Sequence, residues 1–232
     1  MMKHFLTLEW KEFIRASYFQ KGLVIKILLF LALLYFGGMA IFMGAILFFA
    51  LKKFVPAVDP VIIVNNFMIH WLLLNLLVRF FMQQLPVMNI KPLMTIPIKR
   101  NVVIHYLLGK TAMSFFNFVS LFIFLPFSIV LLFNDYPIAN VTFWFVSVMC
   151  LTMVINFINF LINKNNAVFY TIATVLAAFI ALEYFGIFKV SGPFGLAFNA
   201  LYDEPYLVAI PIILMIALSK INFDFVKRGF SL

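Results

Sequence analysis

The chain has 232 residues, of which 66% are hydrophobic and 11% are charged. A soluble domain typically has about 25% charged residues, so the composition excludes an ordinary soluble domain and predicts a single membrane domain over residues 1–232. The net charge of +9 could indicate nucleic-acid binding, but the basic residues lie in the gaps between apolar runs, which is typical of membrane topology and excludes a basic nucleic-acid surface.

Residues 3–18 have the pattern of an interfacial helix. Helical spacing puts an apolar set on one face, Leu6, Trp10, Phe13 and Ile14, and a polar set on the other, His4, Lys11, Glu12 and Arg15. We expect this helix to lie in the cytoplasmic membrane interface with Trp10 at headgroup level; a disordered basic tail is the alternative. The apolar run that follows is too long for the core of a signal peptide, so no cleaved secretory signal is expected.

The apolar runs predict an all-α polytopic membrane protein with six transmembrane helices, at about residues 23–51, 61–82, 102–133, 140–163, 167–188 and 206–223. Gly37, Gly38 and Gly44 in the first span would allow close helix approach. The third span exceeds the ~20 residues needed to cross, so we expect its first turns to stand in the cytoplasm and Pro126 to kink it.

Residues 189–205, between the fifth and sixth spans, are too apolar for a solvated loop. They are also broken by Gly192, Pro193 and Gly195. This combination predicts a short re-entrant or interface-lying element, whose irregular backbone is tolerated only where protein buries it.

Polar residues inside the spans form the candidate pathway or helix-interface set: Asn66, His70, Asn75, Thr152, Asn156, Asn159 and Asn163. Asn66 and His70 are one turn apart, as are Asn75 and Arg79, and such residues normally face protein or a water-filled cavity. His70 could carry protons or bind metal, but a hydrogen-bonded histidine is favoured because no second ligand lies at suitable spacing. The last four residues of the set share one stripe, for which helix joining is favoured over a pathway.

The distribution of basic residues orients the spans. With the N-terminus inside, only Lys52, Lys53 and Lys189 fall outside, and the other fourteen of the seventeen Lys and Arg residues fall inside. This strong positive-inside bias predicts an inner (cytoplasmic) membrane protein with both termini in the cytoplasm.

No constellation for catalysis, cofactor binding or metal binding is evident. Gly109-Lys110-Thr111 ends like a phosphate-binding loop, but Ile104 stands where that motif needs glycine. There is no H-E-x-x-H, no G-x-S-x-G and no pair of acids within a span, and the lone cysteine, Cys150, is expected to be a packing residue. The chain is therefore not expected to be an enzyme, and transport or scaffolding remains.

Residues 79–110 contain three prolines and five of the basic residues, which predicts a cytoplasmic surface segment. Such a gap is longer than a plain helix connection needs. An apolar cluster framed by cations is typical of a docking surface, although the cluster could instead lie on the membrane. The candidate docking residues are Leu85, Pro86, Met88, Lys91, Pro92, Leu93, Pro97 and Arg100.

This order of parts resembles the membrane subunit of type-2 ABC exporters. In the resemblance, residues 3–18 correspond to the elbow helix, about 84–96 to the coupling helix that docks into the ATPase, and about 191–203 to the re-entrant element. The family's recurrent motif is matched by Leu93, Pro97, Ile98, Arg100, Gly109 and Lys110. The stretch EWKEFIRASYFQKGLVIKI further resembles bacterial permeases with a longer, duplicated membrane region, so the chain could be one half.

The resemblance implies a transporter permease in membrane lipid, driven by a separate ABC ATPase subunit and paired with a second permease half as a homodimer or heterodimer. A non-transporting scaffold or assembly protein is the alternative, and a multi-pass membrane enzyme is a third. The substrate is left open, although the Phe-rich spans mildly favour a hydrophobic or amphiphilic cargo.

Overall fold

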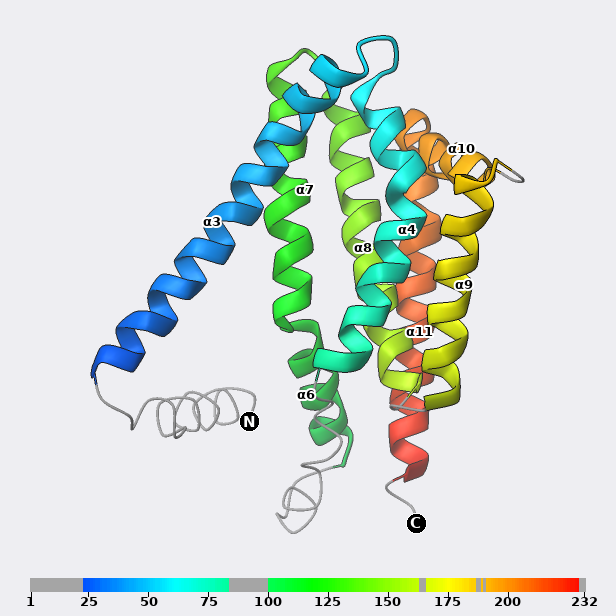
Figure 1. The fold of residues 1–232 in the computed structure, drawn as a ribbon. Helices are drawn as coiled ribbons and strands as arrows, with labels where there is room; N and C mark the ends of the chain where they lie inside the picture. Colours follow the sequence, from blue (N-terminus) through cyan, green and yellow to red (C-terminus); the bar gives the residue numbers. More distant parts are fainter. Residues whose placement is uncertain (1–22, 84–99, 163–165, 187–188, 190, 230–232) are drawn as a thin grey trace.

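The computed structural model describes residues 23–83, 100–162, 166–186, 189 and 191–229, and every regular element among them is helical (Figure 1). The elements in order are α3 (Leu23–Phe54), α4 (Pro60–Met82), α6 (Arg100–Ala112), α7 (Phe115–Phe133), α8 (Ile138–Ile162), α9 (Asn166–Tyr184), α10 (Ser191–Asp203), the 3-10 helix η2 (Pro205–Val208) and α11 (Ala209–Gly229). The predicted interfacial helix, with Trp10, Phe13 and Arg15, lies outside the described residues.

Within the described residues, five helices are long and apolar enough to cross a membrane: Phe30–Phe54 of α3, α4, α7, α8, and the η2–α11 segment Pro205–Arg228. A sixth apolar helix, Tyr170–Tyr184 of α9, is shorter. At about 1.5 Å per residue it is shorter than the ~30 Å hydrocarbon core. The described chain therefore has the architecture of a polytopic membrane protein with five to six apolar helices.

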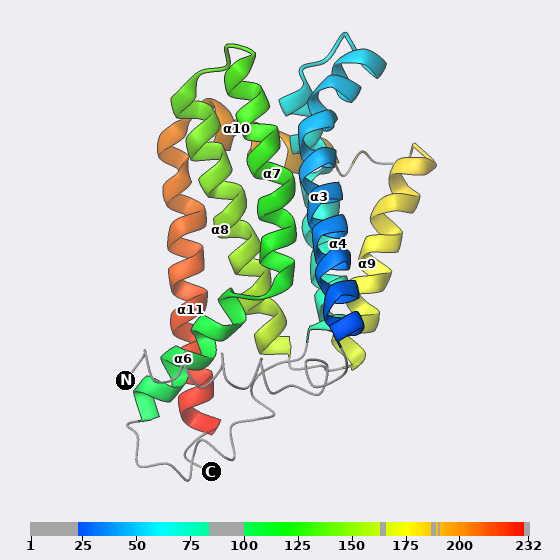
Figure 2. The ribbon, with the colours of Figure 1, turned by 90° about the vertical axis from the view of Figure 1, so that its left-hand side faces the viewer.

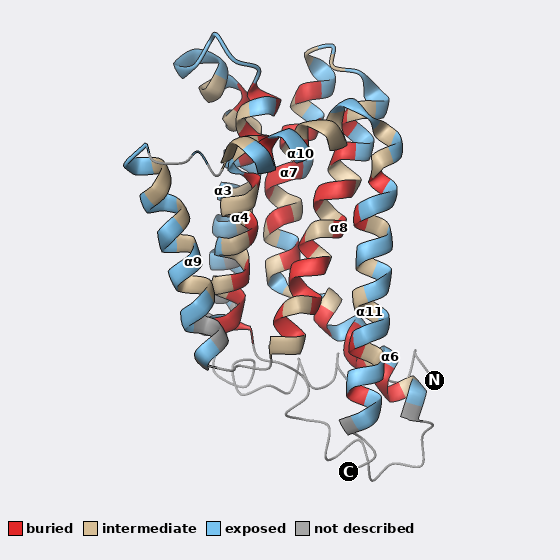
Figure 3. Ribbon diagram, turned by 90° about the vertical axis from the view of Figure 1, so that its right-hand side faces the viewer, coloured by how far each residue is buried: buried red, intermediate tan, exposed pale blue. Residues whose placement is uncertain are grey.

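The packed core of the bundle lies around α8, which contacts α4, α7, α10 and α11. Trp144 of α8 and Phe127 and Leu131 of α7 are fully buried in it. Buried residues accordingly follow α8 and the inner faces of α4 and α7, whereas α9 and α11 show much exposed surface (Figure 3). Exposed large apolar side chains on the outer helices suit a surface that faces lipid.

Helix α3 leans away from the bundle and meets α7 toward its own C-terminal end (Figure 1). The contact depends on Gly44, because a Cβ there would lie 2.1 Å from the carbonyl oxygen of Ile123. The predicted close approach is thus confirmed for Gly44. It is wrong for Gly38, around which a Cβ would meet nothing within 4 Å.

The single long third span that was predicted is wrong, because the chain breaks at Met113–Ser114 into α6 and α7. Asn117 Nδ2 donates to the carbonyl oxygen of Ala112 across the break, at 2.6 Å. Helix α6 turns aside to pack on the end of α11 (Figure 2), through a second apolar cluster that includes Ile104, Phe157 and Val226. Pro126 lies within α7 without ending it.

The irregular element expected at 189–205 is instead mostly a regular helix, α10, which lies across the end of the bundle where α4 begins (Figure 1). Gly195 allows this crossing, because a Cβ at that position would lie 1.9 Å from Asn66 Oδ1 of α4. Pro193 lies in the first turn of α10, where a missing N–H group is tolerated. Entry of this element into the membrane stays a prediction.

Candidate functional site

Arg79 lies at the centre of a buried polar cluster where α4, α7 and α8 meet. Its side chain is 0% exposed, as expected for a polar residue of the second span that faces protein, so its inclusion in the surface segment 79–110 is wrong. Nε donates to Asn75 Oδ1 one turn back on α4. Nη2 donates to Asn117 Oδ1 of α7 at 2.6 Å, and Nη1 donates to Asn156 Oδ1 of α8 at 3.1 Å. One cation therefore bonds side chains on three helices.

Gln83, the C-cap residue of α4, extends this cluster along α8. Its Nε2 donates to Asn156 Oδ1 at 2.9 Å, and its Oε1 accepts from Asn159 Nδ2 at 3.2 Å. We call Asn75, Arg79, Gln83, Asn117, Asn156 and Asn159 the Arg79 cluster. Sequence reasoning identified Asn75, Asn156 and Asn159 but missed Gln83 and Asn117. Gln83 was detectable, because it lies one turn beyond Arg79.

The charge of Arg79 is balanced by dipoles rather than by an acid. The hydrogen-bond partners described for its guanidinium are all side-chain amides, and the ring of Phe116 lies 5.6 Å from it. A buried cation costs several kcal/mol unless its donors are satisfied, and each hydrogen bond to it returns about 1.5–3 kcal/mol. The geometry therefore favours helix joining over a water-filled pathway for Asn156 and Asn159.

His70 joins α4 to α9. Its Nε2 lies 3.4 Å from Glu183 Oε2, and Glu183 Oε1 accepts from the backbone N–H of Ser191 at the start of α10. No acid lies at ligand spacing from His70 in the sequence, but the fold brings Glu183 to it from a distant helix. The Nδ1 atom of His70 is buried without a hydrogen-bond partner in the described part of the chain. The pair therefore connects three elements at this side of the bundle.

The remaining predicted polar residues are dispersed. Asn66 lies under Gly195 of α10, and Thr152 donates to the carbonyl oxygen of Val148 in its own helix. Asn163 lies outside the described residues, as do all the docking residues except Arg100, which begins α6.

Asn65, which sequence reasoning missed, joins α4, α8 and α10. Its Nδ2 donates to Asn199 Oδ1 at 2.8 Å, and its Oδ1 accepts from Trp144 Nε1 at 2.8 Å. No signal in the sequence distinguishes it from its neighbour Asn66, because only the rotation of α4 decides which of the two side chains faces α8.

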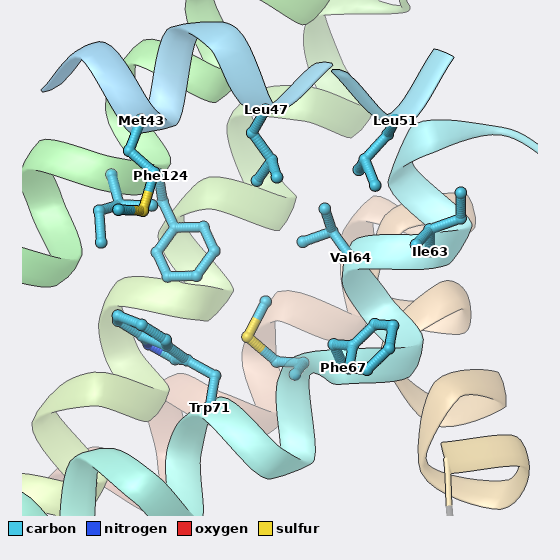
Figure 4. Close-up of a pocket in the computed structure, with 10 residues that line it drawn as sticks. Met43, Leu47, Leu51, Ile63, Val64, Phe67, Trp71 and Phe124 are labelled. Carbon is cyan, nitrogen blue, oxygen red and sulfur yellow. The ribbon is translucent and has the colours of Figure 1, made fainter. Parts of the chain in front are cut away.

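Two of the cavities among the described residues have mainly apolar linings. The first, of about 270 Å³, lies between α3, α4 and α7, and its lining is apolar (Figure 4). Met43 and Leu47 of α3 line it opposite Val64 and Trp71 of α4. The second, of about 600 Å³, lies between α6, α8 and α11, where Leu108, Met153 and Met215 are among its apolar lining residues. Its lining also includes the polar residues His105, Ser219 and Lys220.

A tyrosine–carboxylate contact joins the two turns at the α10 end of the bundle. Tyr136 donates its hydroxyl proton to Asp59 Oδ2 at 2.9 Å, and Asp59 Oδ1 caps α4 by accepting from the N–H of Val61. Burial, and then the hydrogen bond to Asp59 and its charge, raise the pKa of Tyr136. Burial, with the charges of Asp59 and Asp203, raises the pKa of Tyr202 to about 12. Both phenols therefore stay neutral at physiological pH.

A family model, DUF5687, described as a family of unknown function, matches residues 9–232, and the chain belongs to that family. No curated protein and no solved structure matches the chain.

Proposed function

We propose that this member of DUF5687 is the transmembrane permease subunit of an ABC exporter, driven by a separate ATPase subunit through residues 84–96. The observation that carries the proposal is the position of the Arg79 cluster. Gln83 ends α4 directly before the proposed coupling segment, and the cluster fastens that end of α4 to α7 and α8. A displacement of the segment would therefore move three helices together.

The other end of the segment also supports coupling. Residue 100 begins α6, which packs on α8 and α11. In the proposed mechanism, ATP closes two motor subunits, and their motion passes through residues 84–96 into α4 on one side and α6 on the other. Two permease halves, identical or different, would enclose the pathway and alternate between inward-facing and outward-facing states.

The proposed orientation puts the end with α6 and the last turns of α11 in the cytoplasm. Lys110, Lys227 and Arg228 lie at that end, whereas Lys52 and Lys53 end α3 at the other (Figure 1). This distribution supports a chain in the inner membrane with both termini cytoplasmic.

The proposed function predicts a P-loop ATPase in a neighbouring reading frame. The test is co-expression of that ATPase with this chain, followed by capture of the complex and measurement of ATP turnover. The coupling variant carries Lys91→Glu, Leu93→Asp and Arg100→Glu. We expect the variant to insert normally but to capture at least about tenfold less ATPase. The reason is that one apolar anchor and two cations are each replaced by an acid. A matched control carries Lys52→Glu, Lys53→Glu and Val55→Asp at the opposite end and should behave as wild type.

If the coupling variant inserts, still captures the ATPase and still stimulates its turnover, the coupling assignment is wrong. A non-transporting scaffold would capture no ATPase, either as wild type or as the coupling variant. The substitutions at residues 84–96 would then have no effect.

A further inference from the structure

We propose that the cavity between α6, α8 and α11 binds an anionic amphiphile, with its apolar chain among the cavity's side chains and its phosphate or carboxylate on Lys220. The inference names the cargo class of the proposed exporter and, in that respect, rests on the proposed function. The binding itself depends on the cavity alone.

The body of the cavity suits an apolar chain. Its volume of about 600 Å³ lies within the range of ligand pockets. Three helices supply its apolar lining: Leu108 and Ala112 from α6, Met153 and Phe157 from α8, and Met215, Ile216 and Phe223 from α11. Methionine side chains adapt to irregular shapes, so the two in this lining can fit chains of different length.

The polar residues of the cavity suit an anion. Lys220 is exposed and, within the residues described, forms no ion pair, although Asp224 follows one turn later on α11. Ser219 and His105 add hydrogen-bond donors to the lining, and no acid is among the lining residues. The His105 ring is packed 4.9 Å from the ring of Phe223, which holds it at the cavity.

The register of α8 and α11 is fixed beside the cavity. Asn222 is fully buried, and its Nδ2 donates to the carbonyl oxygen of Phe157 at 3.2 Å. Along α11, which runs toward the α6 end of the bundle, Met215 precedes Lys220 by more than one turn, so Lys220 is nearer the α6 end. An amphiphile with its chain along Met215 and its anion at Lys220 would thus have the orientation of a lipid in the adjacent leaflet.

The cavity between α3, α4 and α7 lacks a charged residue that could bind an anion. Its lining carries no charged side chain, so it offers nothing that would select one headgroup over another (Figure 4). Charge complementarity is what assigns the amphiphile to the α6–α8–α11 cavity.

The experiment measures ligand adducts of the purified full chain by native mass spectrometry with two probes that share one chain. Dodecyl phosphate is anionic, and dodecylphosphocholine is zwitterionic. We expect about tenfold tighter binding of dodecyl phosphate, because no choline cation offsets the attraction of its phosphate to Lys220. Lys220→Gln should abolish that preference and Lys220→Arg should keep it. Lys227→Gln is the matched control, because Lys227 is exposed on the same helix but outside the cavity lining.

A second variant tests the apolar body. Ala112→Phe puts a larger side chain into the lining and should weaken the binding of both probes, whereas Ala139→Phe, at the exposed start of α8, should weaken the binding of neither.

Competition with dioleoyl phosphatidylglycerol then identifies the source of the ligand. Displacement of dodecyl phosphate by the diacyl lipid assigns the site to membrane lipid, and its failure to compete assigns the site to a single-chain cargo.

Equal binding of the two probes by wild type, or equal effects of Lys220→Gln and Lys227→Gln, would overturn the inference. The proposed function fails separately, because the binding assay contains no ATPase. If wild type captures no ATPase but still binds dodecyl phosphate in a Lys220-dependent way, the proposed transporter function is wrong and the proposed binding site stands.

Discussion

Arg79 has five N–H donors and no described carboxylate partner, so its stability inside the bundle depends on how neutral amides are oriented around it. Asn156 is central, since its Oδ1 accepts from both Arg79 and Gln83 while its Nδ2 has no described partner. An apolar side chain in place of Asn156 would leave the buried donors of Arg79 and Gln83 unpaired.

Replacing Asn156 by leucine is therefore expected to lower the free energy of unfolding by about 2 kcal/mol, the usual range for a lost hydrogen bond to a charged group. The measurement is reversible unfolding in mixed micelles. Asn140→Leu is the matched control, because Asn140 makes one exposed, long hydrogen bond, at 3.4 Å, to the backbone of Asp203. The control should change stability by less than about 0.5 kcal/mol.

A double-mutant cycle tests whether the cluster acts as a unit. With Arg79→Met already present, Asn156→Leu should cost much less than it does alone, because residues in one buried network are not additive. Equal costs in both backgrounds would show that Asn156 stabilises the bundle by packing and not through Arg79.

The tyrosines at the α10 end give a pH dependence. Their pKa values are raised in the folded protein, to about 12 for Tyr202, above the ordinary value of about 10. The unfolded chain therefore releases these protons first, and the stability that they contribute is complete below pH ~10 and is lost as the pH rises through the folded pKa. Thermal unfolding over this range should show a smaller decline for Tyr136→Phe than for wild type. Tyr184→Phe, which changes a tyrosine that is 84% exposed, should decline as wild type does.

At the level of helices, the contact between α3 and α7 depends on one glycine. Gly44→Ala would put a methyl group 2.1 Å from the Ile123 carbonyl oxygen, and a backbone atom cannot rotate away. We expect a loss of about 1–3 kcal/mol, as for other overpacked contacts. Gly38→Ala is the matched control in the same helix, because that position is open and alanine favours the helix by about 0.5–1 kcal/mol. Equal unfolding free energies for the two variants would contradict this account.

The elements that composition alone could predict are the long apolar helices, since their length and apolarity are set by the bilayer. The break between α6 and α7 was not predictable in this way, because the run on either side of Met113–Ser114 is helix-forming. The side chain of Asn117 folds back across the break and donates to the carbonyl oxygen of Ala112. Helix α10 was mistaken for irregular chain because Gly192, Pro193 and Gly195 were counted as breakers, whereas Gly195 is a contact site with Asn66.

The candidate site was predictable only in part for a related reason. Helical spacing identified the stripe with Asn156 and Asn159, but periodicity says nothing about the partner across the interface. Arg79 was expected both to face protein in the second span, beside Asn75, and to begin the surface segment 79–110, because an unpaired charge is costly in a bilayer. The structure meets that cost with amides from three helices, and no pattern within one helix can reveal such an arrangement.

For the whole molecule, the two ends of the bundle differ in charge, and the proposed coupling requires that the α6 end be cytoplasmic. Lys227 and Arg228 are exposed at that end, whereas Asp59, Asp203 and Glu204 lie at the α10 end. The positive-inside rule predicts this orientation from the basic residues, to which the acids add little. An inverted chain would present residues 84–96 to the wrong compartment, so orientation is a condition for the proposed ATPase contact.

Single cysteines test the orientation in a Cys150→Ala background, where the buried native thiol is removed. An impermeant maleimide should label Ala57→Cys and Glu204→Cys in intact cells, because both positions are exposed at the α10 end. Lys227→Cys, exposed near the end of α11, should react only after permeabilisation. If Lys227→Cys reacts in intact cells and Ala57→Cys does not, the topology is the inverse of the one predicted. It would also remove the basis for coupling to a cytoplasmic ATPase, whatever the Lys220 cavity binds.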